Sequence, residues 1–450
     1  MRSSTPKVLH RVAGVPIVVH AVQAARHANP SSTIVVVAPA SRAEVAAAVG
    51  DGVECVEQPD PLGTGYALKE ALAQVPFSAR HVLLLNGDKP LLRGETVAGL
   101  VELHLKRRAT LTLLTTIVPA QDAGDFARVR RGARNKVIEV IEAPEAKASR
   151  AASVEVNVGV YAIDTTWLRG AVTEFQRHPV GEYYVTDLVA KAVADGKRVE
   201  ALTMGDPAEA IGVKTRAHLA RAEQAMQTRL REAAMDRGVT LLDPATTYLD
   251  ATVELAQDVT VHPNTSIRGL TRVDTGATIG PNAIVVDTAV GAHTTIRAAI
   301  VEDSTLEEGV HVGPFSHLRE GTHLEAGVFV GTHAEVKASH VGRGAHIGHF
   351  SYVGDALIGA DANIGAGTVT CNFDGVTKHV TEIGEGAFIG SDTMLVAPIK
   401  IGARAVTGAG AVVNRDVAPG ETVAGVPARV LHRAASEGTA VGGEGGRSLG

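Results

Sequence analysis

The amino-acid sequence predicts two folds in succession: an α/β domain with a parallel sheet, and then a left-handed parallel β-helix built from hexapeptide repeats. In the first half, β-branched or apolar runs such as Thr33–Pro39 and His81–Leu85 alternate with helix-like segments such as Arg42–Val49 and Glu95–Arg107. In the second half, aliphatic residues recur every six positions. The chain also has 48 glycines and only 3% aromatic residues, which indicates many tight turns and cores of small aliphatic side chains.

The α/β domain is expected to cover residues 1–214, where the alternation of strand-like and helix-like segments ends. The alanine-rich stretch Thr215–Asp236 carries apolar residues at helical spacing and no turn signals, which predicts a helical linker over residues 215–237. The β-helix then covers residues 238–433. The Gly- and Ser-rich residues 434–450 have too little apolar content to pack, so a disordered tail is expected there.

The six-residue period is that of a prism in which each short strand points one aliphatic side chain inward, and three strands make one coil. Residues 372–382 interrupt the period and are expected to form an excursion loop. The inward positions are expected to be Val261, Ile267, Val273, Ile279, Val312, Leu318, Leu324, Val330, Val336, Val341, Ile347, Val353, Ile358, Ile364, Ile383, Ile389, Leu395 and Ile401.

Composition excludes several classes of protein. With 43 Lys and Arg against 49 Asp and Glu, the formal charge of −6 does not favour a general nucleic-acid or acidic-membrane surface. Cys55 and Cys371 are the only cysteines and lie far apart in sequence, so neither a disulfide framework nor a zinc ribbon is expected. The longest apolar stretches fall far short of the ~20 residues of a membrane span, and the N-terminus lacks an apolar signal segment. We therefore expect a cytoplasmic protein without membrane insertion or nucleic-acid partners.

Two cations in the repeats are spaced by one coil. Arg319 and Lys337 are eighteen residues apart, so they should stack on the same edge of the prism. With Lys378 they would suit a phosphate ester, although each could also be a solvated surface charge.

His349 departs from the pattern of the other histidines. His311, His317, His323, His340 and His346 each immediately precede an inward aliphatic residue and should therefore point outward. His349 does not, and an imidazole with a pKa near neutrality can accept a proton from an attacking amine. A structural role for His349 remains the alternative.

Three segments of the repeats, Gly344–Ser351, Asn363–Gly375 and Phe388–Thr393, resemble the acetyltransferase half of the bifunctional N-acetylglucosamine-1-phosphate uridyltransferase/glucosamine-1-phosphate acetyltransferase (GlmU) family. The resemblance implies that His349 is the general base and Glu335 its orienting partner. It implies that the amino-sugar phosphate is held by Arg319, Lys337, Tyr352, Asn363 and Lys378. It places acetyl-coenzyme A against Ala366, Asn372, Phe373, Ser391 and Ala409. Phe373 stands where the family commonly has Tyr. The family's C-terminal arginine that contacts the coenzyme has no in-register match, which leaves Arg429 as its substitute.

The resemblance extends to the α/β half, which is thereby expected to be a Rossmann-like nucleotidyltransferase domain. It rests on Pro6–His10, Gln58-Pro59, Leu62–Gly65, Asn86–Pro90, Glu142, Val156–Gly159 and Gly181–Asp187. It implies that Lys7 neutralises the transferring phosphate and that Asp88, at a strand's carboxyl end, holds Mg²⁺. The remaining residues implied to bind UDP-sugar are Gln58, Gly63 and Thr64 at the uracil, Asn86 and Gly87 beside Asp88, and Glu142 and Asn157 at the sugar.

The α/β half departs from the family at three places. The chain as given starts after the position of the family's first strand and Gly-rich loop, whose backbone N–H groups cradle phosphates. A metal-ligand asparagine of the family falls on Lys214, and a glycine near the sugar falls on Ala127. An ammonium group cannot coordinate Mg²⁺ but could replace its charge. Uridylyl transfer by this chain is therefore expected to be weak or absent.

The resemblance implies an enzyme of UDP-N-acetylglucosamine biosynthesis, which feeds peptidoglycan and lipopolysaccharide synthesis. It would acetylate glucosamine-1-phosphate with acetyl-coenzyme A and then transfer a uridylyl group from UTP with Mg²⁺. A homotrimer is expected, with sites between subunits. The alternatives are an acetyltransferase alone, a trimeric scaffold that senses nucleotide, and a zinc hydratase, although no pair of β-helix histidines has the H-x₄-H spacing of that class.

Overall fold

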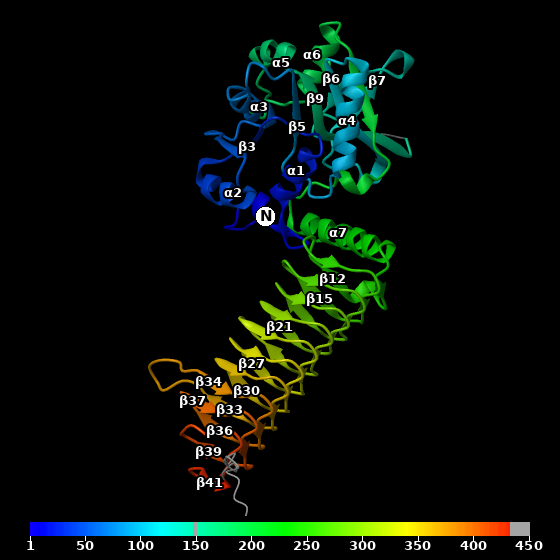
Figure 1. The fold of residues 1–450 in the computed structure, drawn as a ribbon. Helices are drawn as coiled ribbons and strands as arrows, with labels where there is room; N and C mark the ends of the chain where they lie inside the picture. Colours follow the sequence, from blue (N-terminus) through cyan, green and yellow to red (C-terminus); the bar gives the residue numbers. More distant parts are fainter. Residues whose placement is uncertain (147–150, 433–450) are drawn as a thin grey trace, which may run out of the picture. The chain divides into compact units, whose positions relative to one another are not determined.

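The computed structural model describes residues 1–146 and 151–432 of the chain (Figure 1). It divides into two compact units, Met1–Thr228 and Arg229–Gly450, which are described separately below. The tail predicted over residues 434–450 lies outside the described residues.

The first unit is built on a mixed sheet with the strand order β10-β6-β9-β7-β8, in which β5 also pairs with β9. Its strands are β5 (His81–Leu85), β6 (Leu111–Pro119), β7 (Arg128–Arg131), β8 (Val137–Ile141), β9 (Ser153–Asp164) and β10 (Val199–Thr203). Two smaller sheets consist of β1 (Arg11–Val12) with β2 (Val15–Pro16), and of β3 (Thr33–Val37) with β4 (Val53–Glu57).

The sequence prediction of a parallel sheet is wrong for the centre of this unit. β9 lies between β5 and β6 and is antiparallel to both. β7, β8 and β9 follow one another without a long crossover helix, and strands joined in this way pair antiparallel. The parallel pairs that were expected are present at β3–β4 and β6–β10.

Helices cover both faces of the mixed sheet (Figure 1). On one face, Leu100 of α4 packs in a buried cluster with Leu114 and Val160. On the other face, Leu113 and Ile163 pack with residues of α5 and α6. The helices of the unit are α1 (Ile17–Arg26), α2 (Arg42–Val49), α3 (Thr64–Leu72), α4 (Gly94–Arg107), α5 (Thr165–Ala171) and α6 (Asp187–Ala194).

Helix α7 (Arg216–Asp236) follows, and the boundary between the two units falls inside it, between Thr228 and Arg229. Helix α7 coincides closely with the alanine-rich stretch at which the sequence predicted a helix.

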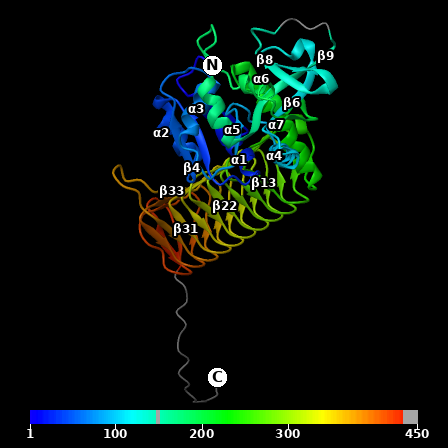
Figure 2. The ribbon, with the colours of Figure 1, turned by 90° about the horizontal axis from the view of Figure 1, so that it is seen from above.

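The second unit is the predicted left-handed parallel β-helix. Over its described residues, strands of two to four residues form three sheets of 12, 10 and 9 strands, which are parallel apart from the last pair, β40 (Thr422–Ala424) and β41 (Arg429–His432). Each strand pairs with a strand one coil away, as Leu318 of β24 (His317–Leu318) does with Val336 of β27 (Glu335–Lys337). Figure 2 shows the coils stacked in succession.

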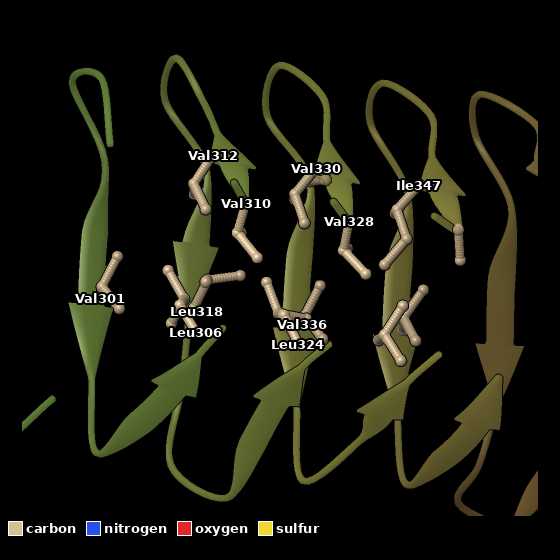
Figure 3. Close-up of a cluster of buried hydrophobic side chains, with 14 of the residues drawn as sticks. Val301, Leu306, Val310, Val312, Leu318, Leu324, Val328, Val330, Val336 and Ile347 are labelled. Atoms are coloured by element: carbon tan, nitrogen blue, oxygen red, sulfur yellow. The ribbon is translucent and has the colours of Figure 1, made fainter. Parts of the chain in front are cut away.

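All eighteen aliphatic positions predicted to point inward are buried, each with at most 3% of its surface exposed. Figure 3 shows several of them, among them Val312, Leu318, Leu324, Val330 and Val336, meeting inside the prism. Burial of one aliphatic side chain per strand is favourable because it removes apolar area from water at every step of the coil. The five histidines that precede inward residues point outward, as predicted.

The predicted excursion loop is also confirmed. Residues 372–380 leave the coil between β33 (Val369–Cys371) and β34 (Thr381–Ile383) and stand out from the prism in Figures 1 and 2.

Candidate functional sites

In the first unit, several predicted nucleotide-binding residues follow the carboxyl ends of two strands. Gln58 comes directly after β4, and its side-chain amide donates a hydrogen bond to the carbonyl of Gly63 at 3.3 Å. Asn86, Gly87 and Asp88 come directly after β5. The carboxyl ends of strands in α/β folds are where ligands bind, because the loops there are free to carry polar groups.

A close backbone approach shapes the loop that ends in Gly63. Gly63 has a φ of +92°, and a Cβ there would lie 2.6 Å from the carbonyl oxygen of Tyr183. The same carbonyl accepts a hydrogen bond from the N–H of Gly65, and the hydroxyl oxygen of Thr64 accepts one from the N–H of Val185. The segment 181–187 therefore holds the loop of residues 62–65 in place.

The predicted sugar-binding residues Glu142 and Asn157 both lie near Tyr161. The hydroxyl of Thr186 donates a hydrogen bond to Glu142 at 2.8 Å, and burial raises the pKa of Glu142. The side-chain amide of Asn157 donates to the hydroxyl of Tyr161 at 2.6 Å, and its carbonyl oxygen accepts from the N–H of Gly159. Ala127, where a glycine was expected, is buried and accepts a hydrogen bond from the N–H of Asn157.

Asp88 is surrounded by ammonium groups. Its Oδ2 lies 2.8 Å from Nζ of Lys7. Lys89 is only 6% exposed and donates to the carbonyl of Ala210 at 2.5 Å. Burial is the main reason why the pKa of Lys89 falls to about 8; Lys214 and Lys7 lower it further, while Asp88 raises it.

In the second unit, four charged side chains form a network on neighbouring coils. Nη1 of Arg319 donates to Glu335 at 2.9 Å, and Nζ of Lys337 lies 2.8 Å from Glu320. Arg319 also lies 3.7 Å from Glu320. The hydrogen bond to Glu320 is the main reason why the pKa of Lys337 is raised, so its charge is secured at neutral pH. Arg319 and Lys337 thus lie on one edge of the prism, as their spacing predicted.

The excursion loop connects to this edge. Lys337 pairs in register with Gly354 of β30 (Tyr352–Gly354). A Cβ at Gly354 would meet the hydroxyl of Tyr352 and the side-chain nitrogen of Asn372. Asn372 is buried and donates to Asp355.

Within the loop, Asp374 accepts hydrogen bonds from the N–H groups of Val376 and Thr377, both at 2.8 Å, and lies 2.7 Å from Nε2 of His379. Phe373 and Lys378 form an isolated antiparallel bridge. Lys378 is also among the side chains that interact with Lys337. The loop thus places Lys378 at the same edge as Lys337.

A different corner of the prism carries His349 and three of the residues predicted to bind acetyl-coenzyme A. Each of the carbonyls of His349, Ala366 and Ser391 accepts a hydrogen bond from a corner residue one coil further on, namely Gly367, Asp392 and Gly410. Ala409 occupies the next position of the row. The row therefore runs His349, Ala366, Ser391, Ala409 along one edge.

The backbone N–H groups of Ala366, Ser391 and Ala409 have no acceptor among the described residues. A glycine lies beside each of these nitrogens on the preceding coil: a Cβ at Gly348, Gly365 or Gly390 would come within 2.6–2.7 Å. A larger residue could not occupy these glycine positions. The edge thus presents a line of backbone donors suited to carbonyl or anionic groups.

The imidazole of His349 is exposed, and its Nδ1 accepts a hydrogen bond from the N–H of Thr332 at 3.2 Å. The neutral ring therefore carries its proton on Nε2. Among the described residues no hydrogen bond joins His349 to Glu335, its predicted partner, which instead bonds Arg319. Asn363 lies on a third stretch of surface, since it pairs with His346 and Phe388 on a neighbouring sheet.

The sequence interpretation missed several residues that hold these groups. Glu320 and Asp355 each lie seventeen residues before the side chain that they bind, Lys337 and Asn372. A search one coil away from each candidate would have found them. Lys89 carries no comparable signal, because its partner Ala210 is far along the chain.

Among the described residues, no cluster of three or more His, Cys, Asp and Glu side chains is placed to hold a metal ion. No described helix combines the length and apolar character that crossing a membrane requires.

Comparisons with known proteins cover both units. Residues 1–202 match the model of the MobA-like NTP transferase domain, and residues 381–415 match that of the bacterial transferase hexapeptide (six repeats). The bifunctional protein GlmU of Heliobacterium modesticaldum is 40% identical over 421 residues, which cover 93% of this chain and 91% of the relative. The protein of that name from Carboxydothermus hydrogenoformans is 37% identical over 419 residues, which cover 93% of this chain and 93% of the relative. The one from Streptococcus agalactiae serotype V is 36% identical over 419 residues, which cover 93% of this chain and 90% of the relative.

Proposed function

Because the chain belongs to the family of the bifunctional GlmU proteins, it acts in UDP-N-acetylglucosamine biosynthesis, and we propose that each unit carries one of the two steps at the residues described above. The β-helix acetylates glucosamine-1-phosphate, and the α/β unit transfers a uridylyl group from UTP to the acetylated product.

For the acetyl transfer, the row of unpaired backbone N–H groups at Ala366, Ser391 and Ala409 is the observation that carries the assignment. These donors bind acetyl-coenzyme A along the edge that begins at His349. The donor nearest the thioester carbonyl stabilises the negative charge that develops on its oxygen. Asn372 and Phe373 lie on the excursion loop that flanks the coenzyme.

The amino sugar is anchored by its phosphate. Cationic donors are supplied by Arg319 and Lys337, which lie where β24 and β27 end, and by Lys378 on the excursion loop beside Lys337. Tyr352 begins β30, three residues after His349. Charge-assisted hydrogen bonds to phosphate are strong and directional, so they fix the amine relative to the thioester.

His349 then accepts the proton. The amine attacks the thioester carbonyl, the C–S bond breaks, and the amine proton passes to His349 and on to the departing sulfur. Nδ1 is the unprotonated nitrogen of the ring and therefore the one that can accept a proton. The hydrogen bond that it accepts from the N–H of Thr332 must then be replaced by one from the substrate amine. Glu335 acts through the network with Arg319 and stabilises the protonated ring by its charge.

For the uridylyl transfer, Gln58, Gly63 and Thr64 bind the uracil, and Glu142 and Asn157 bind the sugar. Lys7 contacts the transferring phosphate, where an ammonium offsets the charge that builds up on the phosphoryl oxygens. Asn86 and Gly87 lie between the end of β5 and Asp88 and contact the same ligand.

Mg²⁺ is the cofactor that this chemistry normally uses, to neutralise phosphate charge. The residues present do not fit a protein-held ion: Asp88 is a single carboxylate, one of its oxygens already bonds Lys7, and Lys89 lies close by. The chain's own residues therefore bind the phosphates and offset their charge.

A homotrimer completes the acetyltransferase site. Asn363 lies on a different sheet from Arg319 and Lys337, so one substrate contacts all of them only if a second copy contributes to the site.

The decisive experiment assays the two half-reactions separately on this chain, as coenzyme A release from acetyl-coenzyme A and glucosamine-1-phosphate, and as pyrophosphate release from UTP and N-acetylglucosamine-1-phosphate. Turnover in the first assay alone would leave an acetyltransferase. Turnover in neither would favour a nucleotide-sensing scaffold.

A further inference from the structure

Three lysines lie near Asp88 in the first unit. Lys7 lies on a short 3-10 helix near the start of the chain and reaches Oδ2 of Asp88 at 2.8 Å. Lys89 follows Asp88 directly, and Lys214 follows Val213, whose N–H bonds the Asp88 carbonyl at 2.9 Å. Lys7 and Lys214 are both close enough to affect the ionisation of Lys89.

The buried member of this group is fixed. Lys89 is 6% exposed, its Nζ bonds the Ala210 carbonyl, and it lies 5.1 Å from the centre of the Phe126 ring. A Cβ at Gly212 would lie 3.4 Å from Nζ of Lys89 and 3.5 Å from Oδ1 of Asp88. The absence of a side chain at Gly212 thus leaves a narrow space with an ammonium group and a carboxylate oxygen beside it.

The same cluster is poorly suited to a divalent cation. Mg²⁺ requires oxygen ligands in octahedral arrangement, and ammonium groups offer none. Two further carboxylates lie near Lys214 and are already engaged: Asp125, whose side chain is largely exposed, is paired with Lys214 at 3.5 Å, and Glu142 accepts a hydrogen bond from Thr186.

We propose that Lys89 and Lys214 replace a protein-bound divalent cation at Asp88, so that the site binds the phosphates of its nucleotide ligand without a metal ion held by the protein. Their two positive charges equal the charge of one Mg²⁺. Lys89 offsets the Asp88 carboxylate from the buried side, which frees Lys7 for the phosphate, and Lys214 supplies an exposed cation at the rim.

This inference rests on the proposed uridylyl-transfer site and deepens it. In this site the charge of the substrate phosphates is offset by lysine ammonium groups, which act as point charges, rather than by a coordinated ion.

The test is the binding of UDP-N-acetylglucosamine to the full chain, measured by calorimetry in EDTA and in Mg²⁺. For the parent chain we expect dissociation constants within about threefold of each other in the two buffers, because no protein-bound ion is needed. Lys214→Asn should weaken binding in EDTA by about tenfold, on the order of one lost charge-assisted contact. Lys89→Met should weaken it by a similar factor, because the Asp88 carboxylate then keeps more of its negative charge near the phosphates. Added Mg²⁺ should restore binding to Lys214→Asn, since the asparagine offers an oxygen ligand.

Lys106→Met is the matched control, because Lys106 is an exposed lysine on α4 outside the cluster. Its binding should equal that of the parent in both buffers. Thermal melts followed by circular dichroism separate loss of fold from loss of binding, and Lys89→Met is expected to keep the fold because it exchanges a buried charge for an apolar side chain of similar length.

A second readout uses the metal alone. Electron paramagnetic resonance of Mn²⁺ without nucleotide should show no tightly bound ion on the parent chain. Tight Mn²⁺ binding that Asp88→Asn removes, or binding of the sugar nucleotide that disappears in EDTA, would overturn the proposal. If the parent binds no UDP-N-acetylglucosamine in either buffer, the proposed uridylyl-transfer site itself is wrong, and the inference is overturned with it.

Discussion

In the proposed acetyl-transfer mechanism, His349 is the side chain that accepts the proton. His349→Ala is expected to lower the rate of acetyl transfer by about 10²–10⁴-fold, the usual contribution of a general base. The variant should keep its fold, because the ring is exposed and makes a single hydrogen bond in the described structure. Steady-state kinetics at saturating substrates measures the effect.

His346→Ala provides the matched control for that variant. His346 is a neighbouring exposed histidine that stacks on Phe329 with ring centres 5.6 Å apart. Its removal should change the rate by no more than a few-fold. If both variants behave alike, His349 has a structural role and another group accepts the proton.

The Lys337→Ala variant tests the proposed binding of the substrate phosphate by Lys337. Lys337→Ala should raise KM for glucosamine-1-phosphate by tenfold or more, on the order of one charge-assisted contact, and leave KM for acetyl-coenzyme A nearly unchanged. Lys400→Ala serves as the control, because Lys400 is also an ion-paired lysine of the β-helix but bonds Glu382 away from the site. Equal effects of Lys337→Ala on both substrates would contradict the assignment.

At the scale of elements, the excursion loop of residues 372–380 is held by the carboxylate of Asp374. Asp374→Ala removes the acceptor of two backbone N–H groups and of His379. Because the loop carries both Phe373 and Lys378, its loosening should raise KM for acetyl-coenzyme A and for glucosamine-1-phosphate together, by roughly tenfold each if about one hydrogen-bonded contact to each ligand is lost. A rise in both KM values would distinguish Asp374→Ala from Lys337→Ala, which is expected to raise only KM for glucosamine-1-phosphate.

The pH dependence of the loop has a definite sign. The hydrogen bond from His379 and those from Thr377 and Val376 hold the pKa of Asp374 well below its ordinary value. A depressed pKa of the folded state stabilises the loop above the unfolded pKa, and this stabilisation is lost only as the pH falls through the lowered value. Near neutral pH, therefore, protonation of Asp374 should not affect either KM value of the parent.

Val376→Ala is the control for Asp374→Ala. Val376 lies at the exposed tip of the loop, and both KM values of this variant should equal those of the parent.

The elements differ in how far the sequence predicts them. Each short strand of the β-helix is specified by one inward side chain, such as Val330 or Ile364, so a fixed spacing in the sequence predicts the whole prism. The α/β unit has no such local rule. The insertion of β9 between β5 and β6 depends on long-range pairing, which strand-like runs alone do not encode.

The same distinction holds for the site residues. Arg319 and Lys337 lie together because they are one coil apart, and the spacing predicts this. The contacts of Lys89 with Ala210 and of Lys7 with Asp88 join segments that are distant in sequence, so a motif can name these residues without showing what they touch.

At the scale of the whole molecule, the two activities are assigned to residues of separate units. Asp88, Lys7 and Glu142 belong to Met1–Thr228, whereas His349 and Lys337 belong to Arg229–Gly450. Variants in one unit are therefore expected to leave the other half-reaction unchanged, since distant sites without shared partners act additively.

The β-helix also carries apolar side chains on outward positions, which bears on its assembly. Ile284 and Ile300 pair in register on the sheet that also holds Glu335 and Tyr352, and they are 41% and 39% exposed. Phe315 and Phe350, at 64% and 67%, flank His333 in a ring stack at a corner. Apolar rows next to a proposed binding site are typical of surfaces that are covered in an assembly.

We expect a homotrimer, with a mass by light scattering of about three times the 46.6 kDa of one chain at micromolar concentration. Ile284→Glu with Ile300→Glu should shift the mass toward the monomer and lower acetyl transfer, because Asn363 would lose the second copy that brings it to the substrate. The matched control is Leu357→Glu, since Leu357 is 52% exposed but lies on another sheet, between His340 and Glu382. A parent chain that is monomeric yet fully active in acetyl transfer would show that one copy contains the whole site, and Asn363 would then have to be removed from it.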